Sequence, residues 1–353
     1  MVGIYVALWI LTTLIWPITP ANRDLDSLKG NKTLYRNSTR EVVYSLPIRC
    51  NAAPKKRVIM LGSSAARSYR PKILQLMLKA DEVDNLATER SNITQIHQVF
   101  DDLRFCLGDK ALGSTKILLI TTAFLYGDDS RWWPGGYTEY EKEKIRHGLY
   151  SGHPKALAPT FGQGSMPWAI DLFRPVFAFY NLRFDGVSLL YKAELAFNRL
   201  YNGPQKVDQG RALLLKYLRA TVPDQTDGAE FGAEQFRELD TLVSEINASG
   251  ASLVLVNEPV DTWLRQATPS FESYRKRMAS FAGKRGIPLI DLSTSARESE
   301  FVDPVDGLHP SDDKMALWTR RLAEQLRLAG TSPSRPVVID SKAVRLLKNK
   351  ALD

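Results

Sequence analysis

The chain has 353 residues, of which 44% are hydrophobic and 24% are charged. This composition excludes a disordered protein and fits one large α/β domain, alone or with an inserted part. The net charge of +8 comes from basic residues spread along the chain, without the basic run or RNA-binding signature that would indicate a nucleic-acid partner.

An uncharged apolar segment, VGIYVALWILTTLIWPIT, begins the sequence at Val2–Thr19. It is long enough to cross a bilayer as a helix and longer than the apolar core of a usual signal peptide. We therefore predict an N-terminal transmembrane helix over residues 1–20 and a polar stalk over 21–56; the alternative is a buried helix of the globular domain. The basic residues from Arg23 to Arg36 would, by positive-inside counting, place the domain in the cytoplasm.

Short apolar runs then alternate with helical patterns. The runs typical of buried parallel strands are Val58–Leu61, Ile117–Thr121, Leu253–Val256 and Ile287–Leu292. The helical patterns are Phe236–Ile246, Tyr274–Lys284 and Ser311–Leu326. This alternation predicts a three-layer α/β fold, with a central parallel sheet flanked by helices.

One long aromatic-rich interval, residues 124–230, interrupts the alternation, and we predict that it is a mainly helical insertion into a domain of residues 57–328. The basic tail, residues 329–353, is predicted to be loosely held. The only two cysteines, Cys50 and Cys106, permit either one disulfide or two buried thiols.

The stretch VIMLGSSAARSYRP, residues 58–71, contains a candidate nucleophile. Its apolar strand runs into Gly62, Ser63 and Ser64 and then into a helix-like stretch. The same pattern also describes a simple turn between a strand and a helix. A serine hydroxyl is a poor nucleophile without a base, so the rest of the chain has to supply one.

The best candidate base is His309, in the stretch FVDPVDGLHPSDD after the last predicted strand. Asp306 precedes it by three residues and can orient the imidazole and stabilise the imidazolium. Loops that follow the strands of a parallel sheet share one edge, so Ser64 and His309 can meet there. The other histidines have weaker contexts: His97 in a helix-like run, His147 and His153 in the insertion, with no partner at metal-ligand spacing.

The order strand-GSS-helix near the start and DGLH near the end resembles the SGNH/GDSL hydrolase superfamily. With its apolar N-terminus, the chain is most similar to the membrane-anchored branch, which includes the D-alanyl-lipoteichoic acid transfer protein and alginate O-acetyltransferases. The resemblance implies an SGNH-like fold and a catalytic triad of Ser64, His309 and Asp306. Ser63 would take the place of the family's aspartate and is the alternative nucleophile.

Two oxyanion blocks of the family are altered here. Where a glycine amide is expected the chain has Arg90 or Ser91, and a backbone N–H of either could replace it. Where the family has an asparagine after the middle strand, Thr122 is the nearest polar residue. Asn257 follows the next strand and is expected to shape that edge. Losing one oxyanion donor costs about a hundredfold to a thousandfold in rate, which a slow transferase could tolerate.

The resemblance implies an acyl or acetyl transferase or an esterase that acts on cell-envelope glycans or polymers. It implies an extracytoplasmic catalytic domain, against the charge count, and no metal or organic cofactor. The partners it implies are an acyl donor, a glycan or polymer acceptor and a multi-pass membrane O-acyltransferase. Two alternatives stay open: a non-catalytic scaffold of the same fold, favoured by the missing asparagine, and a cytoplasm-facing lipid esterase, favoured by the charges after the apolar segment.

Overall fold

The structure is a computed structural model of the whole chain. It describes residues 55–88, 91–126, 232–268, 270–295, 307–310 and 312–330, together with short pieces elsewhere. The chain divides into two compact units. The first unit comprises Met1–Ala52, Phe105–Leu107 and Gly135–Lys206, and the second comprises Ala53–Arg104, Gly108–Pro134 and Val207–Asp353.

The second unit is built on a parallel sheet of five strands in the order β2-β1-β3-β6-β7. The strands are β1 (Arg57–Leu61), β2 (Glu82–Asn85), β3 (Thr115–Thr121), β6 (Ser252–Asn257) and β7 (Leu289–Asp291). In chain order this is the 2-1-3-4-5 arrangement of doubly wound folds, in which ligands bind outside the carboxyl ends of the strands. Strand order reverses between β1 and β3, so the switch point lies where these two strands end.

All four predicted strands are confirmed, and a fifth strand, β2, was missed in the sequence. Its sequence, EVDN, carries two acids and lacks a continuous apolar run. The guanidinium of Arg57 on the neighbouring strand β1 makes this strand possible: it contacts Glu82 at 2.7 Å and the buried Asp84 at 3.8 Å. The pKa of Glu82 is lowered because its hydrogen bond and charge interactions with Arg57 and Lys55 outweigh partial burial.

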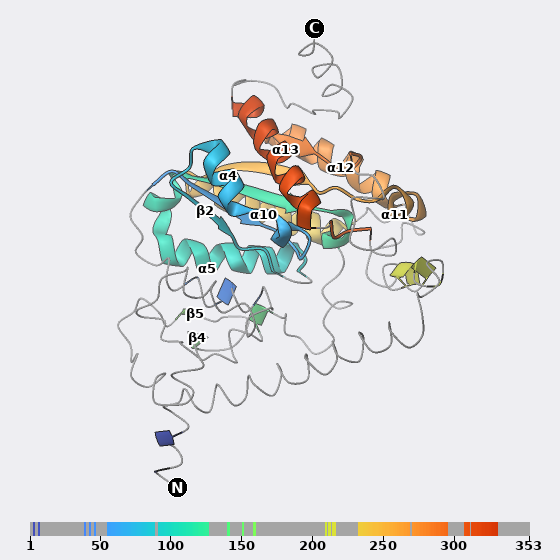
Figure 1. Cartoon of the computed structure of the whole chain (residues 1–353). Coiled ribbons are helices and arrows are strands. Elements are labelled where there is room, and N and C mark those ends of the chain that lie inside the picture. The colour runs from blue at the N-terminus through green and yellow to red at the C-terminus, as the bar shows by residue number, and fades with distance from the viewer. Residues whose placement is uncertain are drawn as a thin grey trace. The chain divides into compact units, whose positions relative to one another are not determined.

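Helices cover both faces of the sheet, so the predicted three-layer arrangement is confirmed for this unit (Figure 1). On one face, α4 (Pro71–Leu78) and α13 (Asp312–Gly330) pack over a core that includes Val58, Met60, Leu118, Ile120, Val254, Trp318 and Leu322. The other face carries α5 (Ile93–Leu112), α10 (Ala233–Ala248) and α12 (Ser270–Arg285). Because side chains alternate along a strand, the buried Ile59, Leu119 and Leu255 point to this second face.

The three predicted helices appear as α10, α12 and α13, each longer than its apolar pattern indicated. The helix expected directly after the serines is wrong in detail. A short 3₁₀ helix, η1 (Ala66–Ser68), follows them, and α4 begins only at Pro71. Proline favours the first position of a helix because its missing N–H would have no partner there and its φ is already helical.

Several predictions fall largely outside the described residues: most of the segment 1–20, most of the stalk 21–56 and all but the first two residues of the tail 329–353. Those two residues, 329 and 330, belong to helix α13 and not to a loose tail. No helix in the described part of the chain is long and apolar enough to span a membrane. Within the predicted insertion the structure describes only short pieces, among them the antiparallel pair β4 (Tyr150–Ser151) and β5 (Ala158–Pro159). Cys106 is disulfide-bonded, and Cys50 is the only other cysteine of the chain.

Candidate active site

Ser64 and His309 lie side by side in the structure, although 245 residues separate them in the chain. The Nε2 atom of His309 lies 3.0 Å from the Oγ atom of Ser64, a hydrogen-bond distance. Ser64 is partly exposed, whereas Ser63 is buried and only 8% accessible. A hydroxyl that has to reach a substrate needs the exposed position, so the geometry favours Ser64 over Ser63.

The turn that presents Ser64 depends on Gly62. A Cβ at this position would lie 2.7 Å from the Cβ of Ala66 and 2.8 Å from the carbonyl oxygen of Ile120 on β3. The turn is also fixed from β2, because the side-chain amide of Asn85 donates to the carbonyls of Ala66 and Arg67 at 3.0 and 3.1 Å. No sequence pattern points to Asn85, because its position depends on the pairing of β2 with β1, and EVDN lacks an apolar strand pattern.

The loop that carries His309 is held by a close packing contact at Gly307. The carbonyl of Gly307 accepts a hydrogen bond from the backbone N–H of Asp261 at 2.9 Å. A Cβ on Gly307 would lie 2.9 Å from the Cβ of Leu264, in helix α11 (Thr262–Ala267). Only glycine allows this approach, which explains the glycine in DGLH. Asp306 lies outside the described residues, so its contact with His309 stays a prediction.

A buried carboxyl group, Glu258, lies near His309 and was missed in the sequence. It follows β6 directly, is 2% accessible, and neither carboxylate oxygen has a hydrogen-bond partner in the structure. Burial raises the pKa of Glu258 to about 7, and the positive charge of His309 opposes this rise. The hydroxyl of Tyr69, which interacts electrostatically with Glu258, is also buried and has no hydrogen-bond partner. An acid directly after a buried strand, in LVLVNEPVD, was the available signal.

The predicted oxyanion residues have different surroundings. The hydroxyl of Ser91 contacts that of Thr88, and both residues are buried. The hydroxyl of Thr122, at the end of β3, is buried and has no hydrogen-bond partner. Asn257 is occupied through its side-chain oxygen, which accepts from the hydroxyl groups of Tyr274 at 2.6 Å and Thr121 at 3.2 Å. Asn257 therefore ties α12 to the sheet edge, as the sequence indicated.

Comparison with known proteins adds little to this geometry. No protein-family model and no curated protein matches the chain. A solved structure from Bacteroides fragilis, described as a "putative acylhydrolase", is similar with a TM-score of 0.38 and 10% identity. The match covers 81% of this chain and 95% of that chain. A likeness this weak carries no conclusion about activity, so the chemistry rests on the side chains themselves.

A cavity of about 800 Å³ lies at the opposite, amino edge of the sheet. Its lining includes Lys56, Lys116 and Ser252, at or next to the first residues of their strands. Neither Ser64 nor His309 lines it, so this cavity is separate from the candidate active site. A group of side chains of the types that can bind a metal ion, His97, Asp101 and Glu245, also lies elsewhere, on α5 and α10.

Proposed function

We propose that this protein is a serine-dependent acyl-transferring enzyme of the SGNH/GDSL type. The observation that carries the proposal is the 3.0 Å contact between the Oγ of Ser64 and the Nε2 of His309. A nucleophile and a base within hydrogen-bond reach, at the carboxyl edge of a doubly wound sheet, are what acyl transfer requires. A serine that only forms a turn does not require a contact with an imidazole from a loop 245 residues away in the chain. The contact therefore favours a catalytic role for Ser64.

In the proposed reaction, Ser64 attacks the carbonyl carbon of an ester while Nε2 of His309 takes the hydroxyl proton. The resulting tetrahedral intermediate collapses, the imidazolium returns the proton to the departing alcohol, and the acyl group stays on Ser64 as an ester. A sugar hydroxyl or water then repeats the sequence in reverse, with His309 again as base. Following the family resemblance, Asp306 holds the imidazole in the productive tautomer. Neither half-reaction requires a metal or an organic cofactor.

The negative charge on the intermediate's oxygen needs hydrogen-bond donors. The amide of Ser64 itself and the hydroxyl of Thr122 are the proposed donors, with Ser91 as a further candidate. The Thr122 hydroxyl has no hydrogen-bond partner within the protein, so it has a proton to donate. Because this hydroxyl is buried, the assignment requires that it becomes accessible when the substrate binds. Thr122 would thus partly replace the asparagine that the family has after this strand.

The disulfide at Cys106 supports placing the catalytic domain outside the cytoplasm, because disulfides persist in oxidising compartments. Together with the apolar segment Val2–Thr19, this favours a membrane-anchored enzyme of the cell envelope over a cytoplasm-facing lipid esterase. Transfer to a glycan or polymer hydroxyl, with a multi-pass O-acyltransferase as acyl-supplying partner, is the corresponding proposal for substrate and partner.

A second candidate function, a non-catalytic scaffold of the same fold, is favoured by the missing asparagine after β3. The two functions differ in a single measurable property, the reactivity of Ser64. A scaffold has no reason to keep a serine that can be acylated.

The deciding experiment treats the purified full chain, in detergent, with a fluorophosphonate probe. We expect labelling of the wild type, loss of the label in Ser64→Ala, and near-normal labelling in Ser63→Ala, the matched neighbouring control. Circular dichroism of each variant checks the fold. Loss of the label only in Ser63→Ala would assign the nucleophile to Ser63 instead, and an unlabelled wild type would favour the scaffold.

A further inference from the structure

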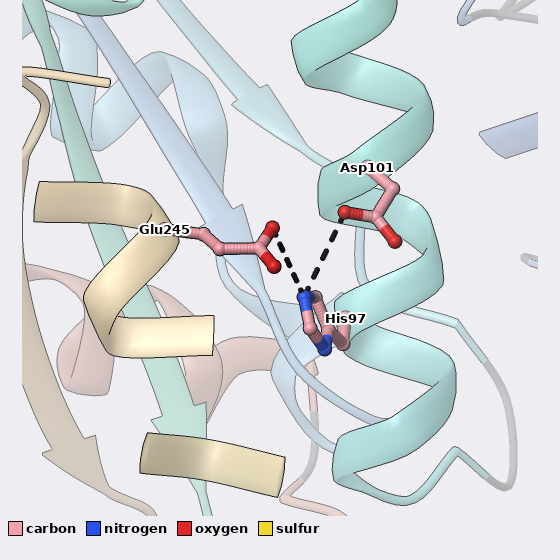
Figure 2. A group of neighbouring side chains, drawn as sticks. All are labelled: His97, Asp101 and Glu245. Carbon is pink, nitrogen blue, oxygen red and sulfur yellow. Dashed lines mark ion pairs between the residues drawn. The ribbon is translucent and has the colours of Figure 1, made fainter. Parts of the chain in front are cut away.

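A buried histidine on α5 faces a pair of carboxylates away from the serine site. His97 is 8% accessible, and its Nδ1 lies 2.5 Å from the Oε1 of Glu238 on α10. Its Nε2 is buried and has no hydrogen bond of good geometry, although an oxygen of Glu245 lies 3.3 Å from it. Figure 2 shows that this nitrogen points between the carboxylates of Asp101, one turn along α5, and Glu245, on α10.

The separations between these atoms match those between ligands of one metal ion. The Nε2 of His97 lies 3.3 Å from an oxygen of Glu245 and 3.7 Å from an oxygen of Asp101. Zinc binds nitrogen and oxygen at about 2.0–2.2 Å, so two ligands at a tetrahedral angle lie about 3.4 Å apart. One ligand atom from each of the three residues lies within 4.8 Å of the others. Binding an ion would draw the more widely spaced of these atoms closer together.

The role of Glu238 strengthens this interpretation. A metal-binding histidine almost always donates its other ring N–H to a carboxylate or carbonyl, which fixes the tautomer that leaves the ligating nitrogen free. Glu238 is in that position at Nδ1. With Nδ1 occupied in this way, Nε2 is the nitrogen left to bind an ion, and it is the nitrogen that faces the two acids.

The charges around the cluster also favour a cation. Three carboxylates surround one imidazole. Among the described residues, Arg104 is a further cation near them, with its Nη1 3.8 Å from an oxygen of Glu245. Arg104 is also shared with Asp109. The side chain of Asp101 is 56% exposed, so an ion and a completing water ligand can enter from solvent.

We propose that His97, Asp101 and Glu245 bind one divalent cation of the zinc class and thereby fasten α5 to α10. The imidazole ligand selects zinc and similar transition metals over Mg²⁺ and Ca²⁺, which prefer oxygen ligands alone. The site takes no part in the acyl transfer proposed for Ser64, and its existence does not depend on that proposal. His97 lacked a metal-ligand pattern in the sequence because Glu245 lies 148 positions further along the chain.

Without a metal the same residues form an ion-pair cluster. Burial lowers the pKa of His97, but Glu238, Asp101 and Glu245 outweigh this effect and raise it to about 9. A protonated imidazole between helices would hold α5 against α10 by charge alone and would have no affinity for zinc. The two states therefore differ in a direct binding measurement.

The test is isothermal titration of Zn²⁺ into the full chain, purified in detergent, freed of any affinity tag and stripped with a chelator. We expect one tightly bound zinc per chain and a higher unfolding temperature with zinc, but no response to Mg²⁺. Asp101→Asn and Glu245→Gln should each weaken zinc binding at least tenfold. Glu238→Gln, which changes only the orienting carboxylate, should weaken it about ten- to a hundredfold.

Asp109→Asn is the matched control, because Asp109 lies on the same helix and its side chain is equally exposed, 56%. Its zinc affinity should equal that of the wild type. Two results would overturn the proposal: no stoichiometric zinc binding by the wild type, which leaves only the ion-pair cluster, or equal affinity in wild type, Asp101→Asn and Glu245→Gln, which assigns the zinc to other residues. Having two independent ligand variants keeps the test decisive if one of them folds poorly.

Discussion

Replacing Glu258 by glutamine should change how the stability of this protein depends on pH. The carboxyl group of Glu258 is 2% accessible and has no hydrogen-bond partner, so ionising it inside the protein is costly. Burial accordingly raises its pKa from 4.5 to about 7, with the charge of His309 acting in the opposite direction. Glutamine has nearly the same shape and cannot ionise.

The sign follows from proton binding in the two states. Between pH 4.5 and about 7 the unfolded chain has lost the proton of Glu258 while the folded protein keeps it, so folding is favoured less as the pH rises. The protonated carboxyl group of Glu258 contributes its full stabilisation of the folded state below pH 4.5, and this stabilisation is lost as the pH rises through about 7. Each pH unit corresponds to about 1.4 kcal/mol, so the total is about 3 kcal/mol of unfolding free energy.

The assay is urea unfolding of the wild type and Glu258→Gln at several pH values from 4.5 to 7.5. The difference between the two proteins removes the contributions of other titrating groups. We expect the unfolding free energy of the wild type to fall by about 3 kcal/mol relative to the variant across this range. Glu272→Gln is the control, because the side chain of Glu272 is 61% exposed. Parallel curves for wild type and Glu258→Gln would refute the burial argument.

Two further predictions concern the proposed triad and the turn before it. His309→Ala should lower turnover of a small acetyl ester by at least about a thousandfold, and Asp306→Asn should lower it strongly. Combining either change with Ser64→Ala should lower turnover little further, because the residues act in one step. If steady-state kinetics show that the losses of the single variants multiply in the double variants, the residues do not act together. Gly62→Ala should cost about 1–3 kcal/mol in urea unfolding and slow fluorophosphonate labelling, because the new Cβ would lie 2.7 Å from that of Ala66; unchanged stability and labelling would contradict the tight-turn account.

The strands that sequence patterns predicted well are those buried on both faces. β1, β3 and β6 are continuous apolar runs because helices cover both sides of the sheet centre. The sequence did not predict β2, because its acidic residues are unfavourable in a buried strand without a cation beside them. That cation is Arg57, which lies 25 positions from Glu82 in the chain. A hydrophobic pattern describes one segment of the chain at a time, so it does not show which residue of another strand will pair with that segment.

The serine site was predictable to the extent that topology determines it. Ser64 follows the first strand, His309 follows the last, and a parallel sheet brings such loops to one edge. The 3.0 Å contact between them follows from two glycines that permit close approach, Gly62 and Gly307. Whether Asp306 completes the arrangement stays a prediction.

By itself, the sequence determined the fold class and the paired serine and histidine, because periodicity and loop order are local properties of the chain. Only the tertiary structure decided which buried acids lack partners and which distant side chains face one another. Glu258 is an unremarkable residue in LVLVNEPVD until burial removes water from both its oxygens. Likewise, His97 contacts Glu238 and Glu245 only because α10 packs against α5. Burial and contacts between distant segments arise from packing, and no local pattern encodes them.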